Sequence, residues 1–205
     1  MIIIAESGST KTDWRFLQED NSIRQARTAG LNPYYRTGEE IRNIIQDELG
    51  NEFTSMSPKI IYFYGAGCNS ESTKNSVISS LRAIWKSAEV IIAHDLLAAA
   101  RSLCLDQPGI ACILGTGSNS CFYNGTVIKE NVPSLGYVLG DEGSGAFLGK
   151  QLLRAYARKE LPDVIHDRFE KRFNYSTSDV LEHIYKQPQP NAFLASFSKF
   201  IYQSN

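Results

Sequence analysis

Gly115-Thr116-Gly117-Ser118-Asn119 is the stretch that decides the fold of this sequence. It follows an apolar run at residues 110–114 and precedes a second strand-like run at residues 120–123. An apolar strand that runs into glycine and hydroxyl residues can bring its backbone close to a phosphate, because glycine lacks the Cβ that would block the approach. Successive backbone N–H groups then point into one concavity that favours an anion. A lone motif of this kind is weak, since an ordinary hairpin turn explains it equally well.

The N-terminus carries a second copy of the same arrangement. Residues 2–6 are a strand candidate, Ser7-Gly8-Ser9-Thr10-Lys11 is a turn of small residues, and residues 12–17 alternate like a returning strand. Aligned with the first stretch, this turn places glycine over glycine and hydroxyl over hydroxyl. Two phosphate-type hairpins, one opening each half, predict a duplicated fold with a ligand between the halves. Neither is a P-loop, because that loop needs glycine directly before Lys-Ser/Thr.

The composition is that of an ordinary globular protein. The 205 residues are 42% apolar and 21% charged, which allows a real core, and the net charge of −1 gives no attraction to nucleic acid or an anionic membrane. No apolar run approaches the roughly 20 residues that span a bilayer, and the start lacks the basic region of a signal peptide. Four cysteines without C-x-x-C spacing predict buried thiols in a reducing, cytoplasmic compartment: Cys68, Cys104, Cys112 and Cys121.

The order of elements predicts an α/β protein of two domains. Residues 1–107 follow the order strand, strand, strand, helix, strand, helix, strand, helix, with a capping-box start at residues 37–40. A turn at residues 106–109 marks the boundary, and residues 108–205 open with three more strands. A glycine-dense loop at residues 135–145 and mostly helical sequence follow. The second half lacks the alternation that completes the first, so it either differs in build or is incomplete.

Asp95 is the sharpest single candidate for chemistry. It follows an apolar strand at residues 89–93 and precedes an Ala-rich helix, and ligands of α/β sheets bind beyond the carboxyl ends of strands. We expect it to be a base that accepts a hydroxyl proton as that hydroxyl attacks a phosphoryl group. A helix N-cap explains the same position equally well. The neighbouring His94 is expected to pack or to support Asp95 rather than to bind a metal.

Three further positions carry candidate binding chemistry. Asp141 stands in the glycine-dense loop, where it could take sugar hydroxyls or metal-bound water, although acidic residues also favour helix starts. Asn32 lies in a polar loop beside Tyr34 and Tyr35, an amide-and-aromatic set suited to a sugar but also common in turns. Lys11 is expected either to contact phosphate or to be a solvated surface lysine. His166 and His183 have no partners at metal-ligand spacing, which favours structural roles.

The five motifs together resemble the N-acetylglucosamine kinases of the BadF/BadG/BcrA/BcrD group, within the actin–hexokinase–Hsp70 ATPase superfamily. The resemblance covers residues 1 to about 155 and rests on residues 5–13, Asn32-Pro33, His94-Asp95, residues 114–119 and residues 135–144. It implies two ribonuclease-H-like domains, 1–107 and 108–205, with ATP and an amino sugar in the cleft between them. It also implies a homodimer.

The resemblance assigns roles residue by residue. It implies that Asp95 is the base for the sugar 6-hydroxyl, and that Glu6 holds Mg²⁺ through water. The phosphates of ATP would be bound by two sets of hairpin residues: Gly8, Ser9, Thr10 and Lys11, then Gly115, Thr116 and Gly117. The N-acetylhexosamine would be held by a further set: Asn32, Ser118, Asn119, Gly136, Tyr137 and Asp141.

Two departures from the family pattern bear on function. The family usually has Asp where this chain has Glu6, so the extra methylene alters the metal geometry. The family's adenosine-binding glycine-rich motif is not found before Asn205. We therefore expect a second domain that is incomplete and a chain that, by itself, binds ATP poorly and turns over little.

Two other functions compete with a sugar kinase. One is an ATPase that energises an electron-transfer enzyme, as other members of the group do, with an iron–sulfur cluster at a dimer interface; the four cysteines here lack that arrangement. The other is a sugar sensor that kept the cleft and lost the chemistry. The sequence leaves the sugar open among N-acetylglucosamine, glucosamine and N-acetylmannosamine.

Overall fold

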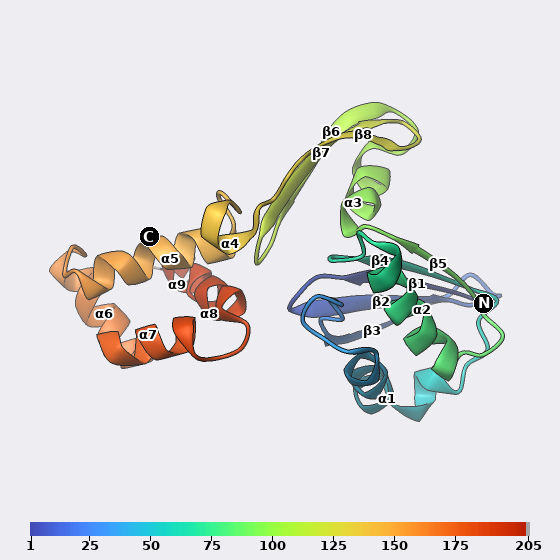
Figure 1. Ribbon diagram of the computed structural model, residues 1–205, viewed down its shortest axis with the longest axis horizontal. Coiled ribbons are helices and arrows are strands. Elements are labelled where there is room, and N and C mark those ends of the chain that lie inside the picture. The colour runs from blue at the N-terminus through green and yellow to red at the C-terminus, as the bar shows by residue number, and fades with distance from the viewer. Residues whose placement is uncertain (204–205) are drawn as a thin grey trace. The chain divides into compact units, whose positions relative to one another are not determined.

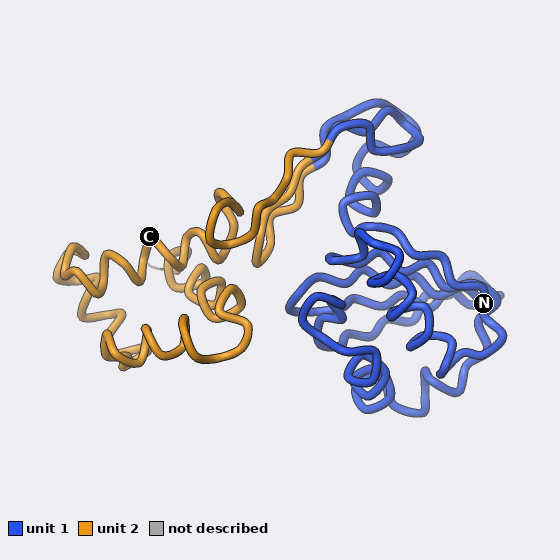
Figure 2. Tube along the Cα trace, viewed as in Figure 1, with its two compact units in different colours: residues 1–111, 121–130 blue, residues 112–120, 131–205 orange. Residues whose placement is uncertain are grey.

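The computed structural model describes residues 1–203 and contains two compact units (Figure 2). Unit 1 comprises residues 1–111 and 121–130, and unit 2 comprises the other residues. The division therefore runs through the strands that follow residue 107, because the second strand-rich segment contributes to both units. A domain boundary between residues 107 and 108 stays a prediction.

Unit 1 is built on an α/β pattern (Figure 1). The predicted order of three strands followed by alternating helices and strands is confirmed. Its elements are β1 (Ile2–Ser7), β2 (Lys11–Leu17), β3 (Ile23–Ala29), α1 (Gly38–Thr54), β4 (Ile60–Gly65), α2 (Glu71–Ile84), β5 (Glu89–Ala93) and α3 (Asp95–Cys104).

The five strands of unit 1 form one mixed sheet in the order β3-β2-β1-β4-β5. Strands β1, β2 and β3 are joined by short turns and pair antiparallel. Strand β4 pairs parallel with β1, and β5 pairs parallel with β4, because helices precede these strands and let the chain cross over. This is the strand order of a ribonuclease-H-like domain. It brings the carboxyl ends of β1, β4 and β5 to one edge of the sheet, where α/β proteins bind their ligands.

One face of this sheet holds the core of unit 1. Ile3 and Ala5 of β1, and Trp14 and Phe16 of β2, are fully buried at alternate positions, as the two-residue period of a strand requires. Helices α1 and α2 pack against one another and cover these residues. The predicted capping box of α1 is confirmed, with the Thr37 hydroxyl and the Glu40 carboxylate bonded to each other's backbone N–H groups.

The rest of the chain opens with a three-stranded sheet and continues as helices. The sheet has the order β6-β7-β8. The elements are β6 (Pro108–Leu114), β7 (Ser118–Asn124), β8 (Ile128–Val132), α4 (Gly136–Leu139), α5 (Gly145–Ala157), α6 (Asp163–Phe173), α7 (Thr177–Tyr185), α8 (Pro190–Ser196) and α9 (Ser198–Gln203). The expectation of a continuous loop at residues 135–145 was wrong. Gly136 adopts a φ of 72°, and the Gly140 N–H then donates to its carbonyl oxygen at 2.8 Å, which closes the single turn α4.

Aromatic side chains build the helical core of unit 2. Phe169 of α6 is fully buried, and its ring centroid lies 4.4 Å from that of Tyr156 of α5 in a tilted arrangement. Phe169 also stacks on Phe197, the residue after α8, with ring centroids 5.7 Å apart. Helices α5 and α8 meet at Gly149, where an added Cβ would lie 1.8 Å from the Leu194 carbonyl oxygen. Close helix contact at this point therefore depends on the missing side chain.

The prediction that the cysteines are buried was wrong for Cys112. Cys68 and Cys121 are buried and Cys104 is half-buried, but Cys112 is exposed. It shares one face of β6 with Ile110 and Leu114, which are 75% and 72% exposed, whereas Ala111 on the other face is buried. The apolar composition of a strand does not reveal which of its faces is covered.

We expect a thiol reagent to discriminate sharply between these cysteines. Burial raises the pKa of the Cys68 thiol from 9.0 to about 11, which lowers its thiolate fraction at pH 8 about a hundredfold. Cys112 should therefore react within minutes with an aromatic disulfide reagent, while Cys68 should react only after denaturant is added. Peptide mapping with Cys112→Ser as control identifies the labelled site, and fast native labelling of Cys68 would contradict the structure.

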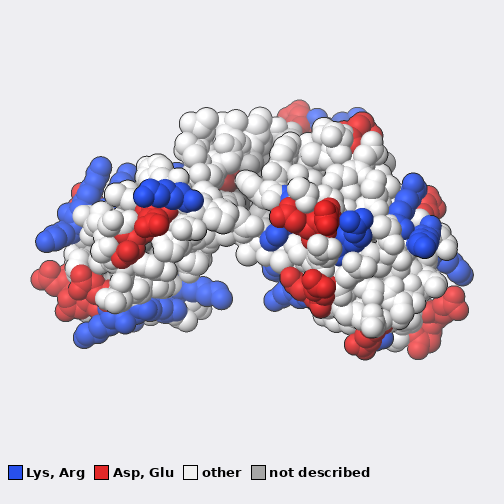
Figure 3. Space-filling model, turned by 60° about the horizontal axis from the view of Figure 1, so that its bottom comes forward, with Lys and Arg blue, Asp and Glu red and all other residues white. Residues whose placement is uncertain are grey.

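Charged side chains of both signs lie on the surface (Figure 3). On the face drawn in Figure 3, acidic and basic side chains are interspersed among uncharged groups on both units. This matches the near-zero net charge of the sequence. No helix within residues 1–203 has both the length and the apolar character needed to cross a bilayer.

Candidate active site

The first predicted phosphate loop is a tight hairpin between β1 and β2. Its turn is closed by the Gly8 N–H, which donates to the Lys11 carbonyl oxygen at 2.9 Å. At its base the hydroxyls of Ser7 and Thr12 lie 2.9 Å apart, and both are buried. The turn is therefore held at its two strand ends, and Thr10 at its tip is exposed.

A neighbouring loop clamps this hairpin from the side. The Gly30 N–H donates to the Thr10 carbonyl oxygen at 3.0 Å, and the Asn32 amide donates to the Ser9 hydroxyl at 2.9 Å. A Cβ at residue 30 would lie 2.4 Å from the Ser9 backbone, so the two segments touch backbone to backbone. Sequence reasoning missed Gly30 as a site residue, although a glycine after a strand and two residues before Asn32 was the available signal.

Asn32 is buried, with 6% of its surface exposed. Its amide oxygen accepts from the Tyr34 N–H at 3.0 Å, and one amide N–H goes to Ser9. Its second amide N–H has no acceptor within residues 1–203, which leaves one donor for a ligand. A sugar-binding role for Asn32 stays a prediction, and its position beside the hairpin is compatible with that role.

Glu6 and Asp95 both lie at the carboxyl edge of the sheet. Glu6 of β1 is level with Tyr64 of β4, and Tyr64 is level with Ala93 of β5. Asp95 follows Ala93 by two residues, so Glu6 and Asp95 stand about two strand spacings, roughly 10 Å, apart at the backbone. Both lie beside the turn that ends β1. The edge thus brings together the predicted base, the predicted metal residue and the predicted phosphate hairpin of unit 1.

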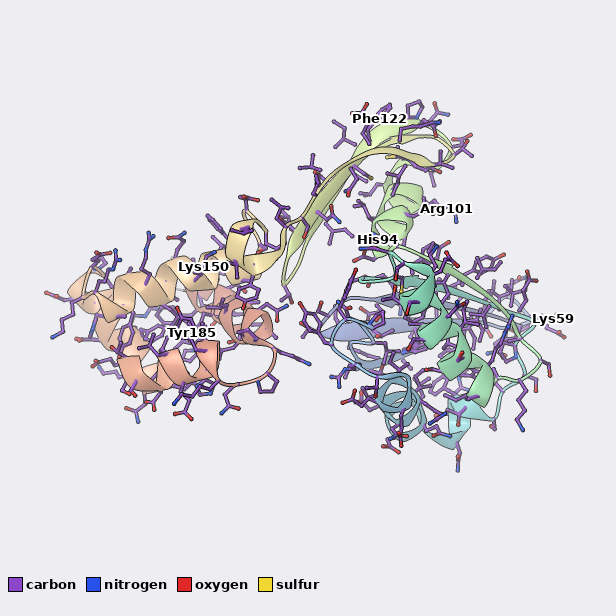
Figure 4. The ribbon with its side chains drawn as sticks, viewed as in Figure 1. Lys59, His94, Arg101, Phe122, Lys150 and Tyr185 are labelled. Atoms are coloured by element: carbon purple, nitrogen blue, oxygen red, sulfur yellow. The ribbon has the colours of Figure 1, made fainter. Side chains whose placement is uncertain are left out.

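His94 supports Asp95 at the start of α3. His94, not Asp95, is the N-cap residue of this helix. It lies where β5 passes into α3, and Arg101 lies further along the helix (Figure 4). The His94 Nδ1 is 2.8 Å from the Asp95 Oδ1, and the Leu96 N–H is nearer to Asp95 (2.9 Å) than to His94 (3.2 Å). The arrangement in which Nδ1–H and Leu96 N–H both donate to Asp95 satisfies all three groups and orients the carboxylate.

The two acidic side chains nearest the hairpin, Asp13 and Glu6, differ in how far cationic partners neutralise them. Asp13 accepts from Lys11 at 2.7 Å and from Arg27 at 2.9 Å, and the bond from Lys11 is the main reason that the pKa of Asp13 is lowered. Within residues 1–203 the Glu6 carboxylate has no ion pair or side-chain hydrogen bond of this kind, although the charge of Lys11 lies nearby. Burial, and then the nearby charge of Asp95, raise the pKa of Glu6, with Lys11 opposing them. A cation bound beside Glu6 and Asp95 would relieve this repulsion.

We expect Glu6→Gln to stabilise the ligand-free protein at neutral pH. The folded-state pKa of Glu6 lies above its unfolded value of about 4.5, so the folded state binds more protons between the two values. The contribution of Glu6 to stability is fully present below pH 4.5, where Glu6 is neutral in both states, and it is lost as the pH rises through the raised pKa. Glutamine removes this loss.

Thermal unfolding between pH 5 and pH 8 tests the expectation. The variant should have the higher Tm at pH 8, and the gap between variant and wild type should narrow towards pH 5. The exposed Glu130→Gln is the matched control. A lower Tm for Glu6→Gln at pH 8 would show that the Glu6 carboxylate is stabilising, and it would contradict the raised pKa of Glu6.

The second predicted phosphate loop, between β6 and β7, is also a closed turn. The Gly115 N–H donates to the Gly117 carbonyl oxygen at 2.9 Å. The first amides of α5 hold the turn, since the Gly145 N–H donates to Gly115 at 2.8 Å and the Ala146 N–H to Thr116 at 3.0 Å. The start of α5 is thereby fixed to the hairpin tip within unit 2.

Asp141 organises the same hairpin. It is 7% exposed, and its Oδ1 accepts from the Ser118 N–H at 3.1 Å and the Ser134 hydroxyl at 3.2 Å. A Cβ at Gly117 would lie 2.8 Å from the Asp141 Oδ2, so glycine is required there by the packing of Asp141 itself. Its second role, in sugar binding, stays a prediction.

The other predicted sugar residues of unit 2 lie around this turn. The Asn119 amide oxygen accepts from the Ser120 N–H at 2.9 Å and from the Asn131 amide at 2.7 Å. Gly136 and Tyr137 begin α4, and the Lys150 ammonium donates to the Tyr137 carbonyl oxygen at 2.8 Å. Asn131 and Lys150 therefore hold predicted sugar residues by hydrogen bonds. Sequence reasoning did not single them out, because neither belongs to a recognisable motif.

Solved structures with the same fold identify the class of protein. A protein from Porphyromonas gingivalis is 41% identical to this chain and superposes with a TM-score of 0.92. The match covers 100% of this chain and 73% of the Porphyromonas gingivalis protein. A protein from Chromobacterium violaceum matches 99% of this chain and 73% of its own at 18% identity and a TM-score of 0.64, which shows the fold alone. Both are named as putative N-acetylglucosamine kinases. No protein-family model and no curated protein sequence matches the chain.

The sheet order of unit 1 and the two glycine hairpins define a member of the actin-like ATPase class of folds. At 41% identity over its full length to the Porphyromonas gingivalis protein, the chain belongs to the N-acetylglucosamine kinase family.

Proposed function

We propose that the chain is a sugar kinase that transfers the terminal phosphoryl group of ATP to the 6-hydroxyl of N-acetylglucosamine or a related amino sugar. The observation that carries the proposal is the edge of unit 1 where Asp95, Glu6 and the clamped Ser7–Lys11 hairpin come together. The name of the Porphyromonas gingivalis protein, a putative N-acetylglucosamine kinase, supports the substrate class. The second hairpin, at Gly115–Gly117 of unit 2, has the same glycine-lined type of backbone, which suits a phosphate.

Asp95 is the proton acceptor in this proposal. Its carboxylate receives the proton of the sugar 6-hydroxyl as that oxygen forms a bond to the γ-phosphorus and the bond to the oxygen of the departing ADP breaks. His94 holds the carboxylate in one orientation by donating to its Oδ1.

The residues at this edge fit Mg²⁺. Glu6 and Asp95 place two carboxylates where one of them has a raised pKa and no cationic partner of its own. Within residues 1–203 no cluster of three or more His, Cys, Asp or Glu side chains could hold a metal ion. Mg²⁺ usually binds through one or two carboxylates, water and substrate phosphates. Bound Mg²⁺ would neutralise charge on the phosphates, and Glu6 would hold it through water.

A kinase assay with a panel of amino sugars tests the proposal. Protein in excess over radiolabelled ATP, with Mg²⁺, should transfer label to one or more of N-acetylglucosamine, glucosamine and N-acetylmannosamine, even if affinity for ATP is weak. Phosphorus NMR of the product should show a 6-phosphate monoester. Calorimetric binding of a sugar without transfer would favour the sugar sensor, and hydrolysis of ATP without transfer to any sugar would favour the ATPase activator.

A further inference from the structure

A groove lies in unit 1 immediately beyond Asn32. Its volume is about 480 Å³, within the range of small-molecule sites. One wall is the loop that follows Asn32 together with the start of α1, and the other wall is the first turns of α2. The lining side chains are Pro33, Tyr34, Tyr35, Arg36, Thr37, Glu40, Ser72, Thr73 and Ser76.

The groove is physically tied to the predicted sugar residue. Gly67 has a φ of 79°, and a Cβ there would lie 2.2 Å from the Asn32 amide oxygen and 2.7 Å from the Tyr34 ring. Both side chains therefore pack on the Gly67 backbone. The Tyr35 N–H also donates to the Asn32 carbonyl oxygen at 3.0 Å, which closes the turn. A ligand held by the free N–H of Asn32 would meet this turn next.

The lining is rich in hydroxyl groups without protein partners. The hydroxyls of Thr37 and Thr73 form hydrogen bonds in the N-terminal caps of α1 and α2. By contrast, the hydroxyls of Ser72 and Ser76 have no hydrogen-bond partner within residues 1–203, and neither do those of Tyr34 and Tyr35. Tyr34 and Tyr35 are 61% and 53% exposed, so their rings as well as their hydroxyls are available.

The charges in the groove favour a neutral ligand. Its one cation, Arg36, donates through Nε to the Gly30 carbonyl oxygen at 2.8 Å, and its one anion, Glu40, accepts from Thr37. A phosphate or nucleotide would find no excess positive charge there. Exposed aromatic faces suit the apolar C–H face of a pyranose ring, and surrounding hydroxyls suit its O–H groups.

We propose that this groove is a second saccharide subsite, so that the substrate class includes disaccharides of amino sugars as well as the monosaccharide. The inference rests on the proposed sugar kinase function, because it takes Asn32 as part of the sugar site. The sugar unit to be phosphorylated lies at Asn32, and the linked unit lies along Tyr34, Tyr35 and the first turns of α2.

Calorimetry with two probes tests the subsite. We expect N,N′-diacetylchitobiose to bind at least about tenfold more tightly than N-acetylglucosamine, a gain of about 1.4 kcal/mol. Ser72→Trp places a bulky side chain in the groove from an exposed helical position, and it should reduce this ratio of affinities to about one or below. Asn75→Trp is the matched control, since Asn75 is exposed on the same helix but does not line the groove, and it should keep the wild-type ratio.

The outcomes separate the two proposals. Binding of N-acetylglucosamine with no gain for the disaccharide would overturn the subsite and leave the kinase proposal standing. An unchanged ratio in Ser72→Trp, with a Tm like that of wild type, would also overturn it. Failure of both sugars to bind would contradict the proposed function itself, and the subsite with it.

Discussion

Replacing Asp95 with asparagine is expected to lower the rate of phosphoryl transfer by about 10²–10⁴-fold, the usual contribution of a general base. The amide cannot accept the proton of the 6-hydroxyl, although it has nearly the size and shape of the carboxylate. Sugar binding should remain measurable, because the oxygen of the new amide could still accept from the Leu96 N–H that now bonds to Asp95 at 2.9 Å. The loss should therefore fall on the rate and not on the affinity for the sugar.

Single-turnover transfer from radiolabelled ATP, with protein in excess, measures the rate even where nucleotide affinity is weak. Calorimetry with the sugar measures binding separately. Asp47→Asn is the matched control, because Asp47 is exposed on α1 and has no hydrogen-bond partner within residues 1–203. A rate within a factor of three of wild type in the Asp95→Asn protein would rule out its role as the base.

His94→Gln tests how the carboxylate is oriented. Glutamine offers an N–H donor on a flexible chain in place of the fixed Nδ1–H that lies 2.8 Å from Asp95. A positioning residue should lower the rate less than the base does, and this variant should show an intermediate rate.

The second large effect is expected from Gly30→Ala. The added Cβ would lie 2.4 Å from the Ser9 carbonyl carbon and 2.5 Å from the Gly8 carbonyl oxygen, where no flexible side chain can give way. Either the hairpin or the loop before Asn32 must move, and overpacking of this kind costs about 1–3 kcal/mol. We expect Tm to fall by roughly 4–10 °C, and binding of both nucleotide and sugar to weaken together.

Gly8→Ala is the matched control within the same hairpin. A Cβ at residue 8 would meet only the Lys11 carbonyl oxygen, at 3.8 Å, so the ligand-free protein should keep its Tm within about 2 °C. Its nucleotide affinity should still fall if the tip faces phosphate. Gly8, which belongs to the hairpin motif, would then affect binding alone. Gly30, which lies outside the motif, would affect both stability and binding. Equal Tm values for the two variants would contradict the backbone packing described for Gly30.

Much of unit 1 could be predicted from sequence because its signals are local. An apolar run at residues 2–6 and alternation at residues 12–17 predicted the strands, and a capping box at Thr37 predicted the start of α1. These patterns depend on the backbone period of each element and on groups within a few residues of one another. The motif order also fixed which residues were worth examining as a site.

The errors arose where the answer depended on distant parts of the chain. The exposure of Cys112 depends on whether anything covers that face of β6, and period-two alternation marks two faces without saying which one is buried. The helical turn α4 depends on a left-handed glycine, which a glycine-dense stretch allows but does not specify.

The sequence by itself determined the order of the elements, the two glycine hairpins and the choice of Asp95, because these follow from residue type and short-range spacing. Only the tertiary structure decided that Glu6 lies at the same edge as Asp95, since that depends on β4 pairing between β1 and β5. It alone also revealed that Gly30 and Gly67 carry the contacts that fix the hairpin and Asn32. Such contacts join segments far apart in the chain, and the absence of a side chain leaves no periodic signal in the sequence.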